Sequence, residues 1–100
     1  MKITEDPLIK SFLDNELRNY DLSRQQHLIS YLILDGVGNR RIGEIFGLTV
    51  ESVKNSNTVI FKKIGVVSRS EMISKVYKNI LRRVVTPPKI EKVILSKGRV

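Results

Sequence analysis

Apolar residues recur every three or four positions along most of the chain, which is the spacing of α-helices that bury one face. The first such segment runs from Pro7 to Asn19, with apolar positions at Leu8, Ile9, Phe12, Leu13 and Leu17. Asp6 can cap this helix, and Pro7 suits its first position. Because so short a helix is marginal alone, its apolar face must pack on something. The sequence leaves open whether that is the core of its own chain or a second copy.

A second helix is predicted from Ser23 to about Leu34. Ser23 is followed three residues later by Gln26, which is the pattern of a capping box. Asp35-Gly36 is a typical helix stop. The positions expected to face inward are Leu28, Ile29, Leu32 and Ile33.

Two short helical patterns joined by a tight turn follow in the stretch from Asn39 to Arg69. The first covers Asn39–Phe46, with Asn39 expected as its cap and Gly47 placed where a helix stop is expected. Thr49 is a suitable cap for the second, which covers about residues 50–63. We expect inward positions at Ile42, Ile45, Phe46, Val50, Val53 and Ile60 or Phe61. A helix, a short turn and a polar second helix are the arrangement that places a helix in a DNA major groove.

A last helix is predicted to begin after Ser68 or Ser70 and to end at Pro87-Pro88. Its apolar face comprises Met72, Ile73, Val76, Tyr77, Ile80, Leu81 and Val84. Residues 89–100 are compatible with a short strand, an arm or a basic tail. The fold class expected is all-α: residues 1–21 form an N-terminal arm and helix, residues 22–86 a compact four-helix helix-turn-helix domain, and residues 87–100 a basic C-terminal tail.

Charge is distributed unevenly over the 100 residues, whose net charge is +8. Residues 1–21 carry three basic and five acidic residues, whereas residues 69–100 carry nine basic and two acidic residues. A basic C-terminal half favours a polyanionic partner, although a merely soluble basic protein would have the same composition. The chain contains no cysteine, which fits a reducing cytoplasm and excludes disulfides and thiol catalysis. No apolar run is long enough to span a membrane.

The segment from Leu22 to Met72 resembles the DNA-binding domain of LuxR/GerE-type transcriptional regulators. The matching pieces follow in the order and spacing of that family without a gap, and they are Leu22-Ser23, Asp35-Gly36, Gly38-Asn39-Arg40-Arg41-Ile42-Gly43, Phe46-Gly47-Leu48-Thr49, Ser52-Val53-Lys54-Asn55, Ile60-Phe61-Lys62-Lys63-Ile64 and Val66-Val67-Ser68-Arg69-Ser70-Glu71. The chain departs from the family pattern at Gln26, Ser30 and Ser56. It also resembles a stand-alone member, because only 21 residues precede the match, where most members carry a receiver or ligand-binding domain.

The resemblance implies roles for three groups of residues. The base contacts would come from Lys54, Asn55 and Thr58, whose side chains suit guanine, adenine and a thymine methyl respectively. The phosphate contacts would come from Arg40, Arg41, Thr49, Ser52, Lys62 and Lys63. Both sets could instead form an ordinary solvated surface. In the family the last helix is a dimerisation element, here Ile73, Val76, Tyr77, Ile80 and Leu81, unless the helix over Pro7–Asn19 covers that face.

The function expected is a sequence-specific, double-stranded DNA-binding transcription regulator that acts in the cytoplasm as a homodimer on an inverted repeat. The alternative is an interaction protein that pairs with another regulator or with RNA polymerase and does not itself bind DNA. An enzyme is disfavoured, since the chain has one histidine, no cysteine and no phosphate-binding glycine loop. His27 is expected to be structural or solvent-facing, and no cofactor or metal is expected. The operator, and whether the protein activates or represses, do not follow from the sequence.

Overall fold

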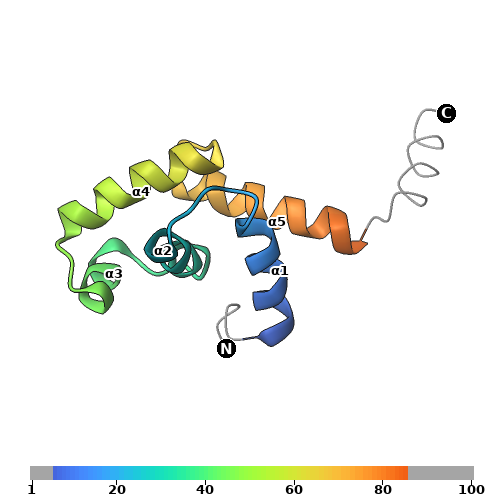
Figure 1. The fold of residues 1–100 in the computed structure, drawn as a ribbon, viewed down its shortest axis with the longest axis horizontal. Coiled ribbons are helices and arrows are strands. Elements are labelled where there is room, and N and C mark those ends of the chain that lie inside the picture. The colour runs from blue at the N-terminus through green and yellow to red at the C-terminus, as the bar shows by residue number, and fades with distance from the viewer. Residues whose placement is uncertain (1–5, 86–100) are drawn as a thin grey trace.

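The computed structural model describes residues 6–85, and within that range the chain is helical without a strand (Figure 1). Its helices are α1 (Pro7–Leu17), α2 (Arg24–Leu34), α3 (Asn39–Phe46), α4 (Val50–Ile64) and α5 (Arg69–Val85). The all-α helix-turn-helix fold predicted from the sequence, with its additional N-terminal helix, is therefore confirmed. The expected basic tail and the expected helix end at Pro87-Pro88 lie outside the described residues.

The starts of these helices follow the capping chemistry expected from the sequence. The Asp6 carboxylate accepts from the backbone N–H groups of Leu8 and Ile9 at the start of α1. At α2, the Gln26 N–H donates to Ser23 Oγ at 3.1 Å, and the Gln26 side chain accepts from the Ser23 N–H at 2.9 Å, which completes the capping box. Ser68 Oγ accepts from the Glu71 N–H before α5, so Ser68 rather than Ser70 fills that place.

The prediction that Asn39 caps α3 is wrong. Gly38 occupies the N-cap position of α3, and no side chain bonds to the first turn there. Asn39 instead lies inside α3, and its Oδ1 accepts from Asn57 Nδ2 of α4 at 2.8 Å. The asparagine therefore connects two helices and leaves the end of its own helix uncapped.

The core contains the apolar face of every helix, and its buried members are Leu13, Leu17, Ile29, Tyr31, Ile33, Leu34, Ile42, Val53, Ile60, Ile64, Val66, Met72, Val76 and Ile80. Five residues expected on the apolar faces of their helices are exposed, and these are Leu8 (65%), Leu28 (44%), Ile45 (48%), Val50 (41%) and Leu81 (56%). The helical period determines which residues share a face. It does not determine how much of that face the neighbouring helices cover.

The turn between α3 and α4 depends on two glycines. Gly47 ends α3 with a φ of 68°, in the left-handed region that glycine adopts without a Cβ penalty. Within α3, the Gly43 carbonyl accepts from the Leu48 N–H at 2.8 Å. A Cβ on Gly43 would lie only 2.5 Å from the Leu48 carbonyl oxygen. The close approach of the turn to α3 therefore requires the absence of a side chain at Gly43.

Helix α1 packs against α5 of the same chain (Figure 1). The contact is centred on Glu16, which is fully buried. Glu16 Oε2 accepts from the Tyr20 hydroxyl and from Asn79 Nδ2, both at 2.8 Å, and Arg83 of α5 approaches Oε1 at 3.1 Å. The question that the sequence left open is thus resolved in favour of the chain's own core.

Candidate nucleic-acid interface

Helix α4 presents one polar face to solvent and buries the opposite one. Lys54, Asn55 and Thr58 are all exposed, whereas Val53 and Ile60 are fully buried. The three exposed residues fall within one arc of the helix, because positions four apart lie one above the other. Thr58 Oγ1 donates to the Lys54 carbonyl oxygen at 3.1 Å, so its hydroxyl is engaged within the helix and its methyl group is the part left for an outside contact. The structure therefore brings the three predicted base-contact residues together.

The start of α4 is organised by a pair of hydroxyl groups. Thr49 Oγ1 accepts from the Ser52 N–H at 3.1 Å and donates to Ser52 Oγ at 2.9 Å. Both residues are exposed at a helix N-terminus, where the helix dipole favours an anion. Glu51 lies exposed in the same turn and opposes an anion there. Thr49 thus acts as the helix cap, and the Ser52 hydroxyl can still donate to a phosphate oxygen.

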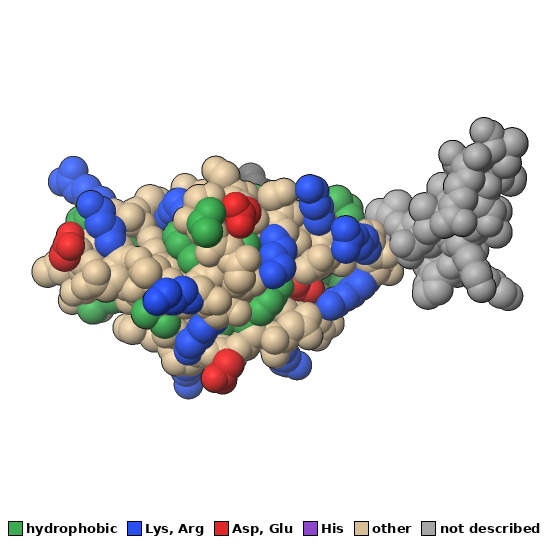
Figure 2. All heavy atoms as spheres, turned by 90° about the horizontal axis from the view of Figure 1, so that it is seen from above, with side chains coloured by type: hydrophobic (Ala, Val, Ile, Leu, Met, Phe, Trp, Pro, Cys, Tyr) green, Lys and Arg blue, Asp and Glu red, His purple; other side chains and the backbone are tan. Residues whose placement is uncertain are grey.

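The four basic residues predicted to contact phosphates lie at the start of α3 and the end of α4, and all are exposed. Arg41 pairs with Glu44 at 3.8 Å, and Lys63 Nζ donates to Gln26 Oε1 of α2 at 2.8 Å. Within residues 6–85, Arg40 and Lys62 make no ion pair. Lys and Arg side chains are spread over the upper face that carries α4, with fewer acidic ones among them (Figure 2). Arg40 and Lys62 are therefore the two cations most available to a phosphate.

Asn57 supports α4 from its buried side, a role that the sequence analysis missed. It is 5% exposed, and its Nδ2 donates to Asn39 Oδ1 across the contact between α3 and α4. A signal was present in the sequence, because Asn57 lies four residues after Val53 and three before Ile60, on the apolar stripe of α4. The amide pair joins the two helices of the helix-turn-helix and helps to fix their relative orientation.

Arg69 and Lys75 of α5 hold neighbouring segments through backbone carbonyls. The Arg69 guanidinium donates to the Val37 carbonyl in the connector between α2 and α3, and burial lowers the pKa of Arg69. Lys75 Nζ donates to the Ile64 carbonyl at the end of α4 at 2.5 Å. Arg69 is therefore a packing residue that joins α5 to the connector between α2 and α3.

The five residues predicted for dimerisation do not share one environment. Val76 is fully buried and Ile80 is 9% exposed, both within the core of a single chain. Ile73 and Tyr77 are half-buried against that core, and Leu81 is 56% exposed. Val76 and Ile80 are buried by the packing of the chain itself, so they do not belong to the exposed part of the predicted interface. Its accessible part is the stripe Ile73, Tyr77 and Leu81.

His27 belongs to the contact between α1 and α2. Its Nε2 lies 3.0 Å from Asp14 Oδ1, and its ring packs edge-on against Tyr31 with centroids 5.1 Å apart. In the part of the chain that the structure describes, no cluster of three His, Cys, Asp or Glu residues could hold a metal ion. Over the same residues, no helix has the length and apolar character needed to cross a membrane. The contacts with Asp14 and Tyr31 make His27 a structural residue between α1 and α2.

The comparisons with known proteins bear on the same helices. The model of the family described as bacterial regulatory proteins, luxR family, matches residues 21–76. This match covers α2, α3 and α4 together with the first part of α5, and it leaves α1 outside. Neither the curated proteins nor the solved structures yield a match to this chain.

Proposed function

This chain belongs to the luxR family of bacterial regulatory proteins, and we propose that it binds double-stranded DNA sequence-specifically, with α4 in the major groove. Members of this family regulate transcription by binding DNA, and they are not enzymes. The proposal divides the chain into an N-terminal helix, the helix-turn-helix domain and a basic tail, and it places the protein in the cytoplasm together with the DNA.

The observation that carries the proposal is the exposed face of α4. Lys54 and Asn55 are exposed there beside the engaged Thr58 hydroxyl, and this face projects from a helix fixed on its opposite side by Val53, Asn57 and Ile60. Lysine donates to the O6 and N7 atoms of guanine, and asparagine can pair with the N6 and N7 atoms of adenine. Rigid elements place such groups more accurately than loops do. We therefore assign base recognition to Lys54, Asn55 and the Thr58 methyl group.

Phosphate binding is assigned to the exposed groups that flank this face. Arg40 and Lys62 are the main contacts, because within residues 6–85 neither makes an ion pair. Arg41 can contact a phosphate after it leaves Glu44, and Lys63 can do so after it leaves Gln26. Thr49 and Ser52 add a contact at the start of α4. Such contacts position the protein on the duplex and set the salt dependence of binding.

We further propose that two copies bind an inverted repeat. The stripe Ile73, Tyr77 and Leu81 supports this, because Leu81 is exposed and Ile73 and Tyr77 are only partly buried along one side of α5. The half-site spacing of a two-fold symmetric site would then report the distance between the two copies of α4. Size-exclusion chromatography with light scattering measures the predicted dimer directly, and Leu81→Asp should shift it toward the monomer.

Selection of bound sequences from a random duplex library tests DNA binding, specificity and symmetry together. We expect an enriched motif with two-fold symmetry. For a selected duplex, Arg40→Ala should weaken binding to all sequences alike and reduce the salt slope by about one. Arg24→Ala serves as the matched control, because Arg24 is an exposed arginine at the start of α2 outside the proposed surface. Binding that is independent of salt and enriches no motif would contradict the proposal.

An alternative function is favoured by the charges of α5. Lys78 and Arg82 are exposed on a face of α5 that neither the proposed DNA contacts nor the proposed dimer stripe uses, which fits a regulator acting by contact with another regulator or with RNA polymerase. Gel-shift and pull-down assays run in parallel separate the two functions. A stable complex with a purified regulator or polymerase, combined with no duplex binding at low salt, would favour this alternative.

A further inference from the structure

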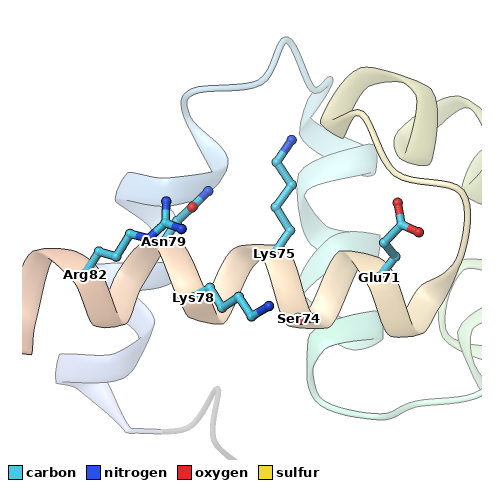
Figure 3. A pocket seen from close by; sticks show the side chains of 6 residues that line it. All are labelled: Glu71, Ser74, Lys75, Lys78, Asn79 and Arg82. Carbon is cyan, nitrogen blue, oxygen red and sulfur yellow. The ribbon is translucent and has the colours of Figure 1, made fainter. Parts of the chain in front are cut away.

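A shallow hollow of about 360 Å³ runs along the outer side of α5. Its lining residues are Glu71, Ser74, Lys75, Lys78, Asn79 and Arg82. All six side chains belong to α5 itself, so long side chains of one helix form its walls (Figure 3). The hollow carries three cations and one carboxylate, and no part of the proposed DNA surface lies in it.

Two of the lining residues are already used by the fold. Lys75 Nζ donates to the Ile64 carbonyl and lies 5.6 Å from the centre of the Tyr20 ring. Asn79 Nδ2 donates to the buried Glu16 carboxylate. By contrast, Lys78 and Arg82 are exposed, and within residues 6–85 they make no side-chain hydrogen bond or ion pair. These two cations are therefore available to an outside partner.

The hollow is distinct from the stripe proposed for dimerisation. Ser74, Lys78 and Arg82 each follow one residue after Ile73, Tyr77 and Leu81, which turns them by about 100° around the helix axis. A second copy placed on the hollow would bring three cations and one carboxylate against the same set, and like charges in contact disfavour such pairing. The charge of the hollow thus points to an acidic partner and away from a second copy.

We propose that this hollow is the docking surface for an acidic amphipathic helix of another protein. Lys78 and Arg82 are four residues apart, so they are neighbours on the helix surface with about 5–6 Å between their Cβ atoms. Two carboxylates spaced four apart on a partner helix have the same separation, which allows both pairs to form at once. Glu71 accepts a basic residue of the partner at the other end and sets the direction of binding. The same carboxylate opposes a phosphate chain, which favours a protein helix over a nucleic acid.

This proposal stands apart from DNA binding and is tested on the free protein. The ¹⁵N-labelled full chain is titrated with an alanine-rich helical peptide of about 15 residues. Its glutamates recur four residues apart along one face. A second peptide of equal composition has its glutamates placed so that no two are three or four residues apart, and neighbouring carboxylates therefore lie on different faces. We expect the first peptide to shift the amide signals of Ser74, Lys78 and Arg82, and the second to bind at least about fivefold more weakly.

Charge reversal provides the matched protein variants. Lys78→Glu combined with Arg82→Glu should weaken the first peptide at least about tenfold. Lys10→Glu combined with Arg24→Glu changes the net charge equally at two other exposed positions and should change the affinity by no more than about twofold. Circular dichroism and thermal unfolding establish that both double variants fold as the parent does.

Four results would overturn the proposal. Peptide-induced shifts centred on Lys54 and Asn55 would mean that the peptide imitates DNA on α4. Equal affinity for the two peptides would show that binding does not depend on carboxylates spaced to match Lys78 and Arg82. Duplex DNA that shifts Lys78 and Arg82 as strongly as α4 would assign the hollow to phosphates. A change in oligomeric state caused by the Lys78→Glu/Arg82→Glu pair would assign it to a second copy.

Discussion

The outer face of α4 and the contact between α1 and α5 both consist of polar side chains, but their surroundings differ. On α4, Lys54 and Asn55 are exposed, and among residues 6–85 their side chains have no ion-pair partner. Between α1 and α5, the carboxylate of Glu16 is fully buried. It accepts hydrogen bonds from Tyr20 and Asn79 and forms an ion pair with Arg83. Polar groups left in water are available for a ligand, whereas polar groups taken out of water must be paired inside the fold. The first set is therefore available for the proposed DNA binding, and the second stabilises the fold.

The largest effect is expected where the buried set is broken. Glu16→Ala removes the acceptor for four side chains, which are Asn19, Tyr20, Asn79 and Arg83, and leaves a cavity beside α5, so we expect the free energy of unfolding to fall by about 3 kcal/mol. Urea denaturation followed by circular dichroism measures this change. Glu44→Ala is the control, because Glu44 is an exposed glutamate whose partner is also exposed. Equal stability of the two variants would show that the α1–α5 contact does not hold the fold together.

A smaller loss is expected at the turn that positions α4. Gly43→Ala places a Cβ 2.5 Å from the Leu48 carbonyl oxygen, and moving backbone out of the way should cost about 2 kcal/mol. Gly38→Ser tests a glycine of the same region with no atom within 4 Å of an added Cβ, and serine at this N-cap should be neutral or stabilising by about 0.5 kcal/mol. Thermal unfolding of both variants measures the difference in stability. An unchanged stability for Gly43→Ala would contradict the close approach of the Leu48 carbonyl to Gly43.

Asn55 and Asn57 allow the exposed face of α4, proposed for binding, to be compared with its buried face. Asn57→Ala breaks the hydrogen bond to Asn39 and should lower stability by about 1–2 kcal/mol. Asn55→Ala should change stability by less than about 0.5 kcal/mol, because Asn55 is exposed. For sequence specificity on a selected duplex, Asn55→Ala should have the larger effect, because only Asn55 is proposed to contact a base. Denaturation and site selection on both variants provide the two measurements, and loss of specificity without loss of stability at Asn57 would contradict the assignment.

The smallest effect concerns pH. Burial, reinforced by the hydrogen bond to Glu16, raises the pKa of Tyr20 from 10.0 to about 12. Because the raised pKa favours the neutral phenol in the folded state, the corresponding stability is fully present below pH 10 and is lost as the pH rises through 12. Tyr20→Phe should therefore show a shallower loss of stability over this interval. Denaturant titrations at a series of alkaline pH values measure the two slopes, and identical slopes would rule out the contribution of Tyr20.

The sequence predicted the helices well because caps and periodicity are local. Asp6, Ser23 and Thr49 each precede an apolar stripe, and each caps the helix that was expected. It failed at the edges of the stripes, where Leu28, Ile45 and Val50 lie outside the narrow buried arcs. Whether an edge position is covered depends on the neighbouring helix, which periodicity within one segment does not specify.

The exposed face of α4 proposed for binding was easier to predict from the sequence than the buried residues that support it. Lys54, Asn55 and Thr58 could be placed together because a polar arc opposite Val53 and Ile60 follows from the helical period. Asn57 and Glu16 were missed, since a buried polar residue is recognised only through a partner far along the chain, here Asn39 and Asn79. The choice of α5 as the partner of α1 is likewise a property of the assembled fold.

The central claim is that the exposed face of α4 recognises bases. Its most direct test compares the sequence motifs selected by the parent protein and by Lys54→Ala from the same random duplex library. The account predicts that the variant folds normally, still binds, and loses its preference at one base position, with a cost of about 1–3 kcal/mol on the parent site. An unchanged motif and affinity for Lys54→Ala would contradict it.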